Sequence, residues 1–515
     1  MKTPILGSAY VARSVNAADN RMMNIFPEIV PEGGKEPAFL QRAPGLRLLA
    51  SVGVGPIRGL NSYGGYLYVV SGRTLYKLDS SYTITTIGNV SGDTAPVSMA
   101  NNGNQLFIAC DGPSYVYNAT TSAFGQITDV DFPGALTVSY LDGYFVFIEP
   151  DSQRVWVTAL NDPLSIDPLD FASAEGDPDL LVSSIVDHSE VWLFGTNSVE
   201  VWYNSGNADF PLQRIQGAFN EIGCAATFSV AKLDNALFWL GQDARGKGMI
   251  YRANGYTGIR VSTHAVEWQI QQYERIDDAV AYTYQQDGHS FYVINFPTAN
   301  ATWVYDVATQ AWHERASWVN GDFVRSRANC QTFFNNNVTV GDYLNGNIYT
   351  FDLNVFADHD RVQRWVRTWR ALPTGQNNLK RTAQHSLQLD CESGVGLSGL
   401  DPLSTSAEAQ TYYLLTQDND TIQTQNSEDI IAQESGAVVG ADPKIMLRWS
   451  DDGGHTWSRE HWASMGKIGQ YGRRVFWRRL GMTMKLRDRV YEISGTDPVK
   501  VAIMGAELLL DGTDA

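Results

Sequence analysis

The sequence has little charge and lacks the long apolar runs and cysteine motifs that define several protein classes. Charged residues make up 18% of its 515 residues, below the roughly 25% of an average globular protein. Aromatic residues make up 11%, which excludes a disordered chain, since such chains are charge-rich and poor in aromatics. No apolar run reaches the ~18 residues of a spanning helix, so we expect no membrane insertion.

The four cysteines are Cys110, Cys224, Cys330 and Cys391, and no two of them form a CxxC pair. This spacing excludes the usual zinc patterns and makes a disulfide framework improbable, so we expect folding in a reducing cytoplasm. The first 21 residues carry one lysine and no long apolar core, unlike a signal peptide.

Positive charge is also scarce. Lys and Arg number 38 against 56 Asp and Glu, a net charge of −18. Residues 1–357 hold 20 basic and 35 acidic residues, net −15, and residues 358–515 hold 18 and 21, net −3. Phosphate binding needs clustered cations, so we do not expect nucleic-acid binding over the whole surface.

Glycine, tyrosine, phenylalanine and tryptophan are plentiful, at 46, 24, 21 and 14 residues. This composition favours an all-β protein, and the length predicts two to four domains. A hairpin unit repeats seven times, each copy a strand of alternating aromatics and aliphatics between Gly, Asn or Asp turns. The copies align on Leu67, Leu106, Phe145, Trp192, Phe238, Phe291 and Val340, with spacings of 39, 39, 47, 46, 53 and 49 residues.

A spacing of roughly 40–50 residues is typical of one four-stranded propeller blade. We therefore predict a β-propeller of six or seven blades over 51–355, with irregular antiparallel sandwiches as the alternative. The proline-rich residues 1–50 predict an extended N-terminal arm with little regular structure, packed on its own propeller or on a neighbouring subunit. Residues 356–515 predict a C-terminal β-sandwich, jelly-roll-like, for docking. Within it, 393–442 is expected to be a long loop.

The segment SDDGGHTW matches the Asp-box pattern S-x-D-x-G-x-T-W in full. Its motif residues are Ser450, Asp452, Gly454, Thr456 and Trp457. The physical content of this pattern is a hairpin turn, in which the aspartate accepts backbone N–H bonds and glycine permits positive φ. We interpret it as a structural turn, since a sialidase would carry several copies, an arginine triad and a tyrosine nucleophile.

The strongest positive cluster lies near the C-terminal end. It comprises Arg473, Arg474, Arg478, Arg479, Lys485, Arg487 and Arg489, with Phe476 and Trp477 between them. It could contact an acidic neighbour or DNA phosphates, or be a strand whose cations face solvent and pair with Asp488 and Glu492. The interface candidates are Arg473, Arg474, Trp477, Arg478 and Arg479, together with Trp365 and Trp369, which could instead be core residues.

No catalytic constellation is present. The sequence has no G-x-S-x-G, HExxH or P-loop pattern. The local cluster of His359 between Asp358 and Asp360 is better explained as a solvated loop than as a metal site. We therefore expect a protein that is not an enzyme and has no cofactor, no metal ion and no catalytic residue.

Both ends of the chain resemble one family, the tail hub (nozzle) proteins of short-tailed phages, also called packaged-DNA-stabilisation proteins or tail accessory factors. Near the start the resemblance is carried by Asn24 and Phe26 to Glu28, then Gly34 to Pro37 and Pro44 to Leu46. Near the end it is carried by Asp452, Gly453, Arg459, Glu460, Arg473, Arg474, Trp477, Arg479 and Gly481. The blade-like middle agrees in type and order, and the segment at about 396–442 is longer than the family pattern.

The resemblance implies a structural virion protein of the tail, assembled in the host cytoplasm. It implies a homo-hexameric ring below the portal or head-to-tail adaptor that extends the DNA channel and helps retain packaged DNA. Its implied partners are further copies of itself, the portal or adaptor, a tail spike or fibre, a tail needle or plug, and transiently the packaged DNA. The alternatives are a glycan-binding or adhesion propeller and, less favoured, a sialidase-like hydrolase.

Overall fold

The computed structural model describes the chain except for residues 14–17, 32, 93, 175, 208, 374–380, 399–410, 414–430, 434–438, 484–488 and 513–515. The chain divides into two compact units. One consists of 8–13 and 46–352, and the other of 1–7, 14–45 and 353–515. Most of the predicted loop at 393–442 lies outside the described residues.

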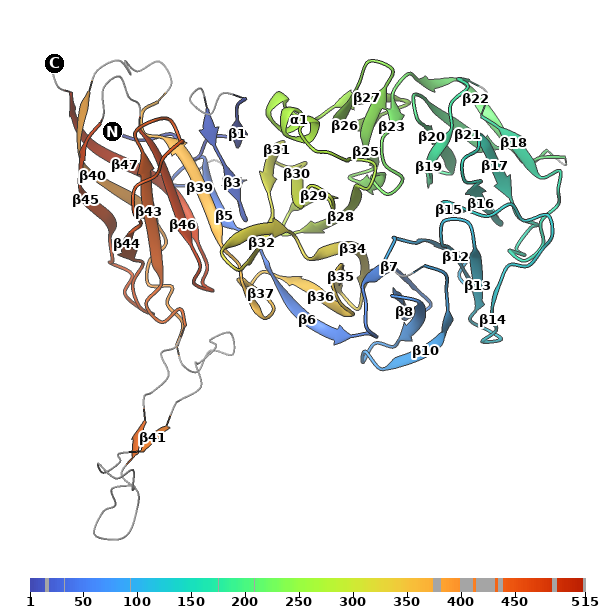
Figure 1. The fold of residues 1–515 in the computed structure, drawn as a ribbon, viewed down its shortest axis with the longest axis horizontal. Coiled ribbons are helices and arrows are strands. Elements are labelled where there is room, and N and C mark those ends of the chain that lie inside the picture. Colours follow the sequence, from blue (N-terminus) through green and yellow to red (C-terminus); the bar gives the residue numbers. More distant parts are fainter. Residues whose placement is uncertain are drawn as a thin grey trace, which may run out of the picture. The chain divides into compact units, whose positions relative to one another are not determined.

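The 46–352 unit is a β-propeller whose described residues form seven blades arranged in a ring (Figure 1). The first four blades are antiparallel sheets of consecutive strands. They are β7 (Ile57–Tyr63), β8 (Tyr66–Ser71), β9 (Thr74–Leu78) and β10 (Ile84–Asn89); β11 (Ser98–Asn101), β12 (Gln105–Ala109), β13 (Ser114–Asn118) and β14 (Phe124–Gln126); β15 (Val138–Leu141), β16 (Tyr144–Ile148), β17 (Arg154–Val157) and β18 (Phe171–Ser173); and β19 (Leu181–Asp187), β20 (Glu190–Gly195), β21 (Val199–Asn204) and β22 (Leu212–Asn220).

The next two blades contain the elements β23 (Gly223–Cys224), β24 (Ala231–Leu233), β25 (Ala236–Asp243), β26 (Gly246–Asn254) and β27 (Thr257–Arg260), then β28 (Val280–Gln286), β29 (His289–Phe296), β30 (Ala301–Asp306) and β31 (Ala311–Glu314). Helix α1 (His264–Gln271) lies in the connection between them, and the hairpin β32 (Ala316–Val319) and β33 (Asp322–Arg325) follows. The seven aligned residues of the repeat all lie in the second principal strand of their blades and are buried. The period of the sequence therefore predicted the blades correctly.

The seventh blade is completed by the strand that precedes the first. Its order is β34 (Ala328–Phe334), β35 (Asn337–Asp342), β36 (Asn347–Asp352) and β6 (Gly45–Ser51). Arg47 Nε donates to Asp352 Oδ2 at 2.8 Å, and Ser51 Oγ donates to Asn347 Oδ1 at 2.7 Å. A strand from the beginning of the unit thus pairs with its last strand, which closes the ring and removes two free edges.

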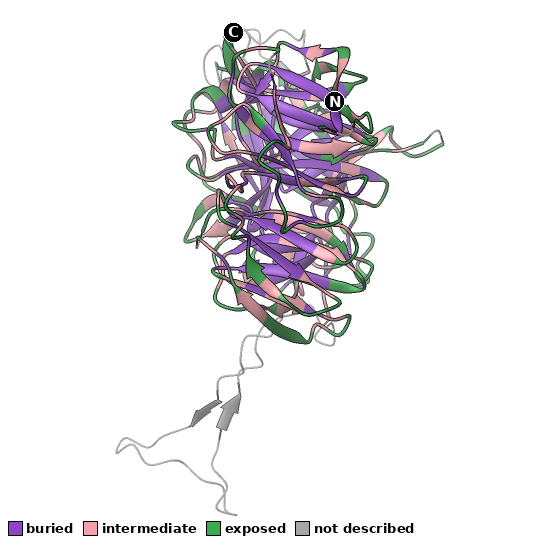
Figure 2. Cartoon of the chain, turned by 90° about the vertical axis from the view of Figure 1, so that its right-hand side faces the viewer, coloured by how far each residue is buried: buried purple, intermediate pink, exposed green. Residues whose placement is uncertain are grey.

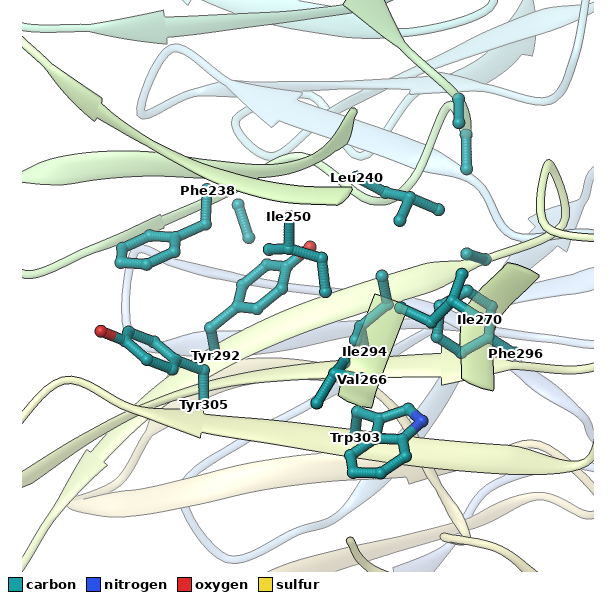
Figure 3. Packing of buried hydrophobic residues seen from close by; sticks show 14 of the residues in the cluster. Phe238, Leu240, Ile250, Val266, Ile270, Tyr292, Ile294, Phe296, Trp303 and Tyr305 are labelled. Atoms are coloured by element: carbon teal, nitrogen blue, oxygen red, sulfur yellow. The ribbon is translucent and has the colours of Figure 1, made fainter. Parts of the chain in front are cut away.

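Apolar side chains fill the space between neighbouring blades. Figure 3 shows the cluster between the fifth and sixth blades, where the rings of Phe238 and Tyr292 stack at 5.4 Å. Val266 and Ile270 of α1 close the same cluster. In Figure 2 the buried residues follow the strands, while the exposed ones are concentrated in the turns. Burying a large apolar side chain contributes about 1.5–3 kcal/mol, so these contacts between blades hold the ring together.

The second unit is a β-sandwich. One sheet has the order β4 (Ile25–Ile29), β5 (Ala38–Arg42), β47 (Ala502–Gly512), β40 (Thr382–Cys391) and β45 (Val475–Met482). The other contains β3 (Met22–Met23), β39 (Trp365–Arg370), β46 (Val490–Gly495), β43 (Lys444–Ser450) and β44 (His461–Ser464). The phenol of Tyr491 donates to Gln384 Oε1 and so links the two sheets. Short hairpins are formed by β37 (Ala357–Asp358) with β38 (Arg361–Val362), and by β41 (Thr411–Tyr413) with β42 (Ile431–Gln433).

The N-terminal segment differs from the prediction of an arm with little regular structure. Its residues 25–42 form β4 and β5, which extend the sheet of the sandwich through the pairing of Leu40 with Ile503. Ile25, Phe26 and Leu40 are buried there. The segment is extended, but its partner is the C-terminal sandwich, which was not one of the two partners expected from the sequence.

Candidate functional site

The predicted arginine cluster lies on β45, the edge strand of its sheet, and on the two residues immediately before it. Arg473, Arg474, Arg478 and Arg479 are exposed, and none of them forms a salt bridge with another described residue. The guanidinium of Arg478 lies 4.6 Å from the ring of Phe476, which faces solvent beside it. Strand alternation sends Val475 and Trp477 inward and Phe476 and Arg478 outward. The structure therefore brings these cations together on one accessible strand.

Three predicted interface tryptophans are not accessible. Trp365 and Trp369 are fully buried, and Trp369 Nε1 donates to Thr3 Oγ1 at 3.0 Å. Trp477 is buried too, and its Nε1 donates to the carbonyl oxygen of His461 at 2.8 Å. This corrects their assignment as interface candidates, because side chains packed inside one sandwich cannot contact a neighbouring molecule. Their role is to fill the sandwich core.

The rest of the predicted cluster does not join the exposed arginines. Arg489 is buried and forms a bidentate ion pair with Asp451, in which Nε donates to Oδ1 at 2.7 Å and Nη2 donates to Oδ2 at 2.9 Å. Its guanidinium also donates to the carbonyl oxygen of Leu480 at 2.6 Å. Lys485 and Arg487 lie outside the described residues. Arg489 is therefore a structural cation that ties β46 to the turn after β43.

The Asp-box segment forms a tight turn after β43. Asp452 Oδ1 accepts the backbone N–H bonds of His455 and Thr456 at 3.0 and 2.8 Å. Ser450 Oγ donates to Asp452 Oδ1 at 2.6 Å and accepts the N–H of Gly454, whose φ is 104°. The hydroxyls of Ser450 and Thr456, followed by the backbone bonds, hold the pKa of Asp452 well below its usual value. The ring of Trp457 lies 4.8 Å from the Arg448 guanidinium.

The propeller encloses a channel of about 520 Å³ lined by the innermost strand of every blade. Its walls are mostly neutral: Asn101 Nδ2 donates to Asn61 Oδ1 at 2.9 Å, and Thr283 Oγ1 donates to the Lys232 carbonyl oxygen at 2.6 Å. Burial lowers the pKa of Lys232, whose Nζ lies 3.8 Å from Asp187 Oδ1. Neutral amides and hydroxyls of this kind can donate to and accept hydrogen bonds from water in the channel.

No group of three or more His, Cys, Asp and Glu side chains in the described ranges could hold a metal ion. None of the described helices is long and apolar enough to cross a membrane.

A surface on the third blade was not predicted from the sequence. The connection from β17 to β18, residues 158–170, exposes the three leucines Leu160, Leu164 and Leu169 beside Asp162 and Asp167. Pro163 and Pro168 each follow an aspartate and precede a leucine. An Asp-Pro pair is typical of a turn, so the sequence indicates an ordinary surface turn. The feature that could have indicated this surface is the presence of three leucines in a connection too long for a hairpin turn.

Models of one protein family match both units of the chain. The model described as "Bacteriophage P22 Gp10, beta-propeller" matches residues 1–356, and the model described as "Bacteriophage P22 Gp10, beta-sandwich" matches residues 408–510. The chain belongs to the bacteriophage P22 Gp10 family. This confirms the resemblance to packaged-DNA-stabilisation proteins of short-tailed phages, and with it the all-β fold of propeller and sandwich. A member of the Gp10 family is a structural phage tail protein and a component of the virion.

Curated protein sequences contain no match to this Gp10-family chain. Among solved structures, "Crystal Structure of Mitotic Checkpoint Complex" matches at 12% identity and a TM-score of 0.41, over 63% of this chain and 96% of that one. "Crystal Structure of the N-terminal Domain of Nup159" matches at 10% identity and a TM-score of 0.38, over 64% and 98%. The PorZ structure from Porphyromonas gingivalis matches at 9% identity and a TM-score of 0.36, over 67% and 44%. With TM-scores this low, these likenesses say nothing about what the chain does.

Proposed function

We propose that this Gp10-family chain forms a six-subunit tail hub that sits below the portal or its adaptor, continues the DNA channel and helps to retain packaged DNA. The observation that carries the proposal is the family match in both units, over residues 1–356 and 408–510. The hub would also dock tail spikes or fibres and a plug, and would be assembled in the host cytoplasm.

The charge of the chain supports this proposal. Residues 1–357 carry 20 basic and 35 acidic residues, a net charge of −15. In the proposed ring, a negatively charged wall of the DNA channel, which is distinct from the channel inside each propeller, repels the phosphates of DNA and so lets the duplex slide without adhering.

The test is the mass and symmetry of the purified full-length protein, with and without a portal–adaptor complex. Mass photometry gives the number of copies, and negative-stain images give the symmetry. A six-fold ring that forms alone or on the portal is the expected result. A monomer that ignores the portal at every protein concentration tested would refute the hub, and glycan arrays and a sialidase assay would then test the binding and hydrolase alternatives.

A further inference from the structure

The loop of the third blade displays apolar side chains to solvent. In residues 158–170, which we call the acidic leucine loop, Leu160, Leu164 and Leu169 are 60, 50 and 77% exposed. The loop joins β17 to β18 (Figure 1). Single exposed leucines are common on protein surfaces, but a cluster rimmed by charge marks an interaction site.

The acidic leucine loop has a fixed shape. Ile166 is buried in the core between the second and third blades, and its N–H donates to Asp129 Oδ2 at 3.2 Å. The backbone N–H of Asn161 donates to the Gly143 carbonyl oxygen at 2.7 Å, and that of Ala159 donates to the Ser165 carbonyl oxygen at 3.0 Å. A loop that is already ordered loses little conformational entropy on binding, so its leucines are ready for a partner.

The carboxylates of the loop also remain available. Asp162 Oδ1 accepts the N–H of Leu164 at 3.1 Å, and Asp167 Oδ1 accepts the N–H of Leu169 at 2.9 Å. Their second oxygens have no partner among the described residues. Partial burial, and then the charge of Asp167, raises the pKa of Asp170. The loop therefore presents a cluster of negative charge that no cation of the described chain neutralises.

A surface of the opposite kind lies on the sandwich. The edge strands β44 and β45 of its two sheets are neighbours, joined by the bond from Trp477 Nε1 to the His461 carbonyl oxygen. We call the exposed residues on these strands and on the connection between them the arginine–aromatic edge: Trp462, Tyr471, Arg473, Arg474, Phe476 and Arg478. Trp462, Tyr471 and Phe476 are 64, 76 and 36% exposed. Aromatic and arginine residues are those enriched at the centres of stable interfaces.

We propose that the acidic leucine loop of one copy binds the arginine–aromatic edge of a second copy. Leucines then pack on aromatic rings, and the carboxylates of Asp162 and Asp167 meet guanidinium groups that form no ion pair with the described residues of their own chain. The two surfaces differ, so each copy uses one surface for each of two neighbours. Such heterologous contacts generate a closed ring or a filament rather than a two-fold dimer. The inference rests on the proposed hub and deepens it by naming its subunit contact.

The experiment is a charge swap in the full-length protein, followed by mass photometry under the conditions in which the wild type assembles. The first variant carries Asp162→Arg with Asp167→Arg, and the second carries Arg474→Asp with Arg478→Asp. We expect each to weaken assembly at least tenfold. When the two variants are mixed, each loop is opposite in charge only to the edge of the other variant, so only alternating contacts can form. A single chain with all four changes should recover assembly, because both surfaces then have their charge reversed and attract each other again.

Two controls separate this contact from general effects. Glu221→Arg with Glu274→Arg changes the charge by the same amount at exposed propeller residues outside the loop, and should leave assembly unchanged. Leu169→Ser removes apolar contact at constant charge and should also weaken assembly, while thermal melting stays as in the wild type.

Several results would overturn the inference. If the wild type forms rings and both reversals still assemble, the contact is wrong although the hub stands. If each reversal blocks assembly but the four-fold change does not recover it, the two surfaces are not partners. If the arginine reversal leaves rings intact and instead abolishes binding to a 30-base-pair duplex, the edge serves DNA. A wild type that never assembles, with or without portal, refutes the hub and this contact together.

Discussion

Replacing Arg327 by methionine tests how the seventh blade is held. Arg327 Nε donates to Asp342 Oδ2 at 2.9 Å, and both side chains are almost completely buried. Tyr349 donates its hydroxyl to the same carboxylate oxygen at 2.9 Å, and the N–H of Leu344 donates to Oδ1 at 2.8 Å. These bonds join β35 to β36 in the blade that closes the ring.

The expected cost follows from the charge that is left behind. Arg327→Met keeps most of the volume but leaves the Asp342 carboxylate buried without a cation, which costs about 3–5 kcal/mol. For a unit of this size that lowers the melting temperature by something on the order of 6–10 °C. Adding Asp342→Leu removes the buried charge, so the double variant should be more stable than Arg327→Met alone.

The measurement is a double-mutant cycle by differential scanning calorimetry on the full-length protein. The two single changes and their combination should show a coupling energy of at least about 2 kcal/mol. If Arg327→Met costs less than about 1 kcal/mol, or if the double variant loses the sum of the two single losses, the buried pair does not stabilise the blade as we argue.

Three further predictions concern other parts of the molecule. Asp452→Ala removes the acceptor of the turn bonds to His455 and Thr456 and should cost about 1–2 kcal/mol, with faster hydrogen exchange confined to residues 450–457; unchanged exchange there would contradict it. Tyr292→Phe deletes the buried bond to the Ser229 carbonyl oxygen, 2.7 Å long, and should lower stability by about 1–2 kcal/mol with the blade count unchanged in images; a variant as stable as the wild type would contradict it. Burial raises the pKa of both Cys110 and Cys224 to about 11, so these thiols stay protonated up to about pH 9 and should react with Ellman's reagent only after unfolding; fast labelling of either in the native protein would show that its site opens.

The blades could be predicted because each is a local pattern. A residue such as Phe238 is buried in the second principal strand of its own blade. A regular repeat of such strands along the sequence indicates a propeller. The closing strand β6 could not be predicted in the same way, because its partner β36 lies about 300 residues later and leaves no local mark.

The strands β4 and β5 were not predicted, because the prolines of residues 1–50 indicated a segment with little regular structure. Pro27 lies inside β4, opposite Leu40, and β4 is the outermost strand of its sheet. An edge strand tolerates proline, since one side of its backbone needs no N–H donor. The sequence shows the proline but does not show that the strand is at an edge.

The candidate surfaces were predicted only in part. Alternation along β45 correctly allowed outward-facing arginines, but it could not decide whether Trp365 and Trp369 were interface or core residues, because β39 is buried on both faces. The acidic leucine loop was not predicted, since the exposure of Leu169 depends on where the third blade ends rather than on its neighbours in sequence.

The sandwich unit is built from three separate stretches of chain, 1–7, 14–45 and 353–515, and most of the propeller lies between the last two in the sequence. At a synthesis rate of about 5–20 residues per second, β47, the partner of β5 in the sheet, is therefore completed only roughly 23–92 s after β4 and β5. Over that time Ile25, Phe26 and Leu40, buried in the finished protein, have no sheet to cover them. All strands of the propeller are present once residue 352 has emerged, so we expect the propeller to fold before the sandwich. Until the sandwich folds, the apolar residues of the N-terminal strands remain exposed, and we expect this segment to be the most prone to aggregation. We also expect chaperones that bind nascent chains to bind it.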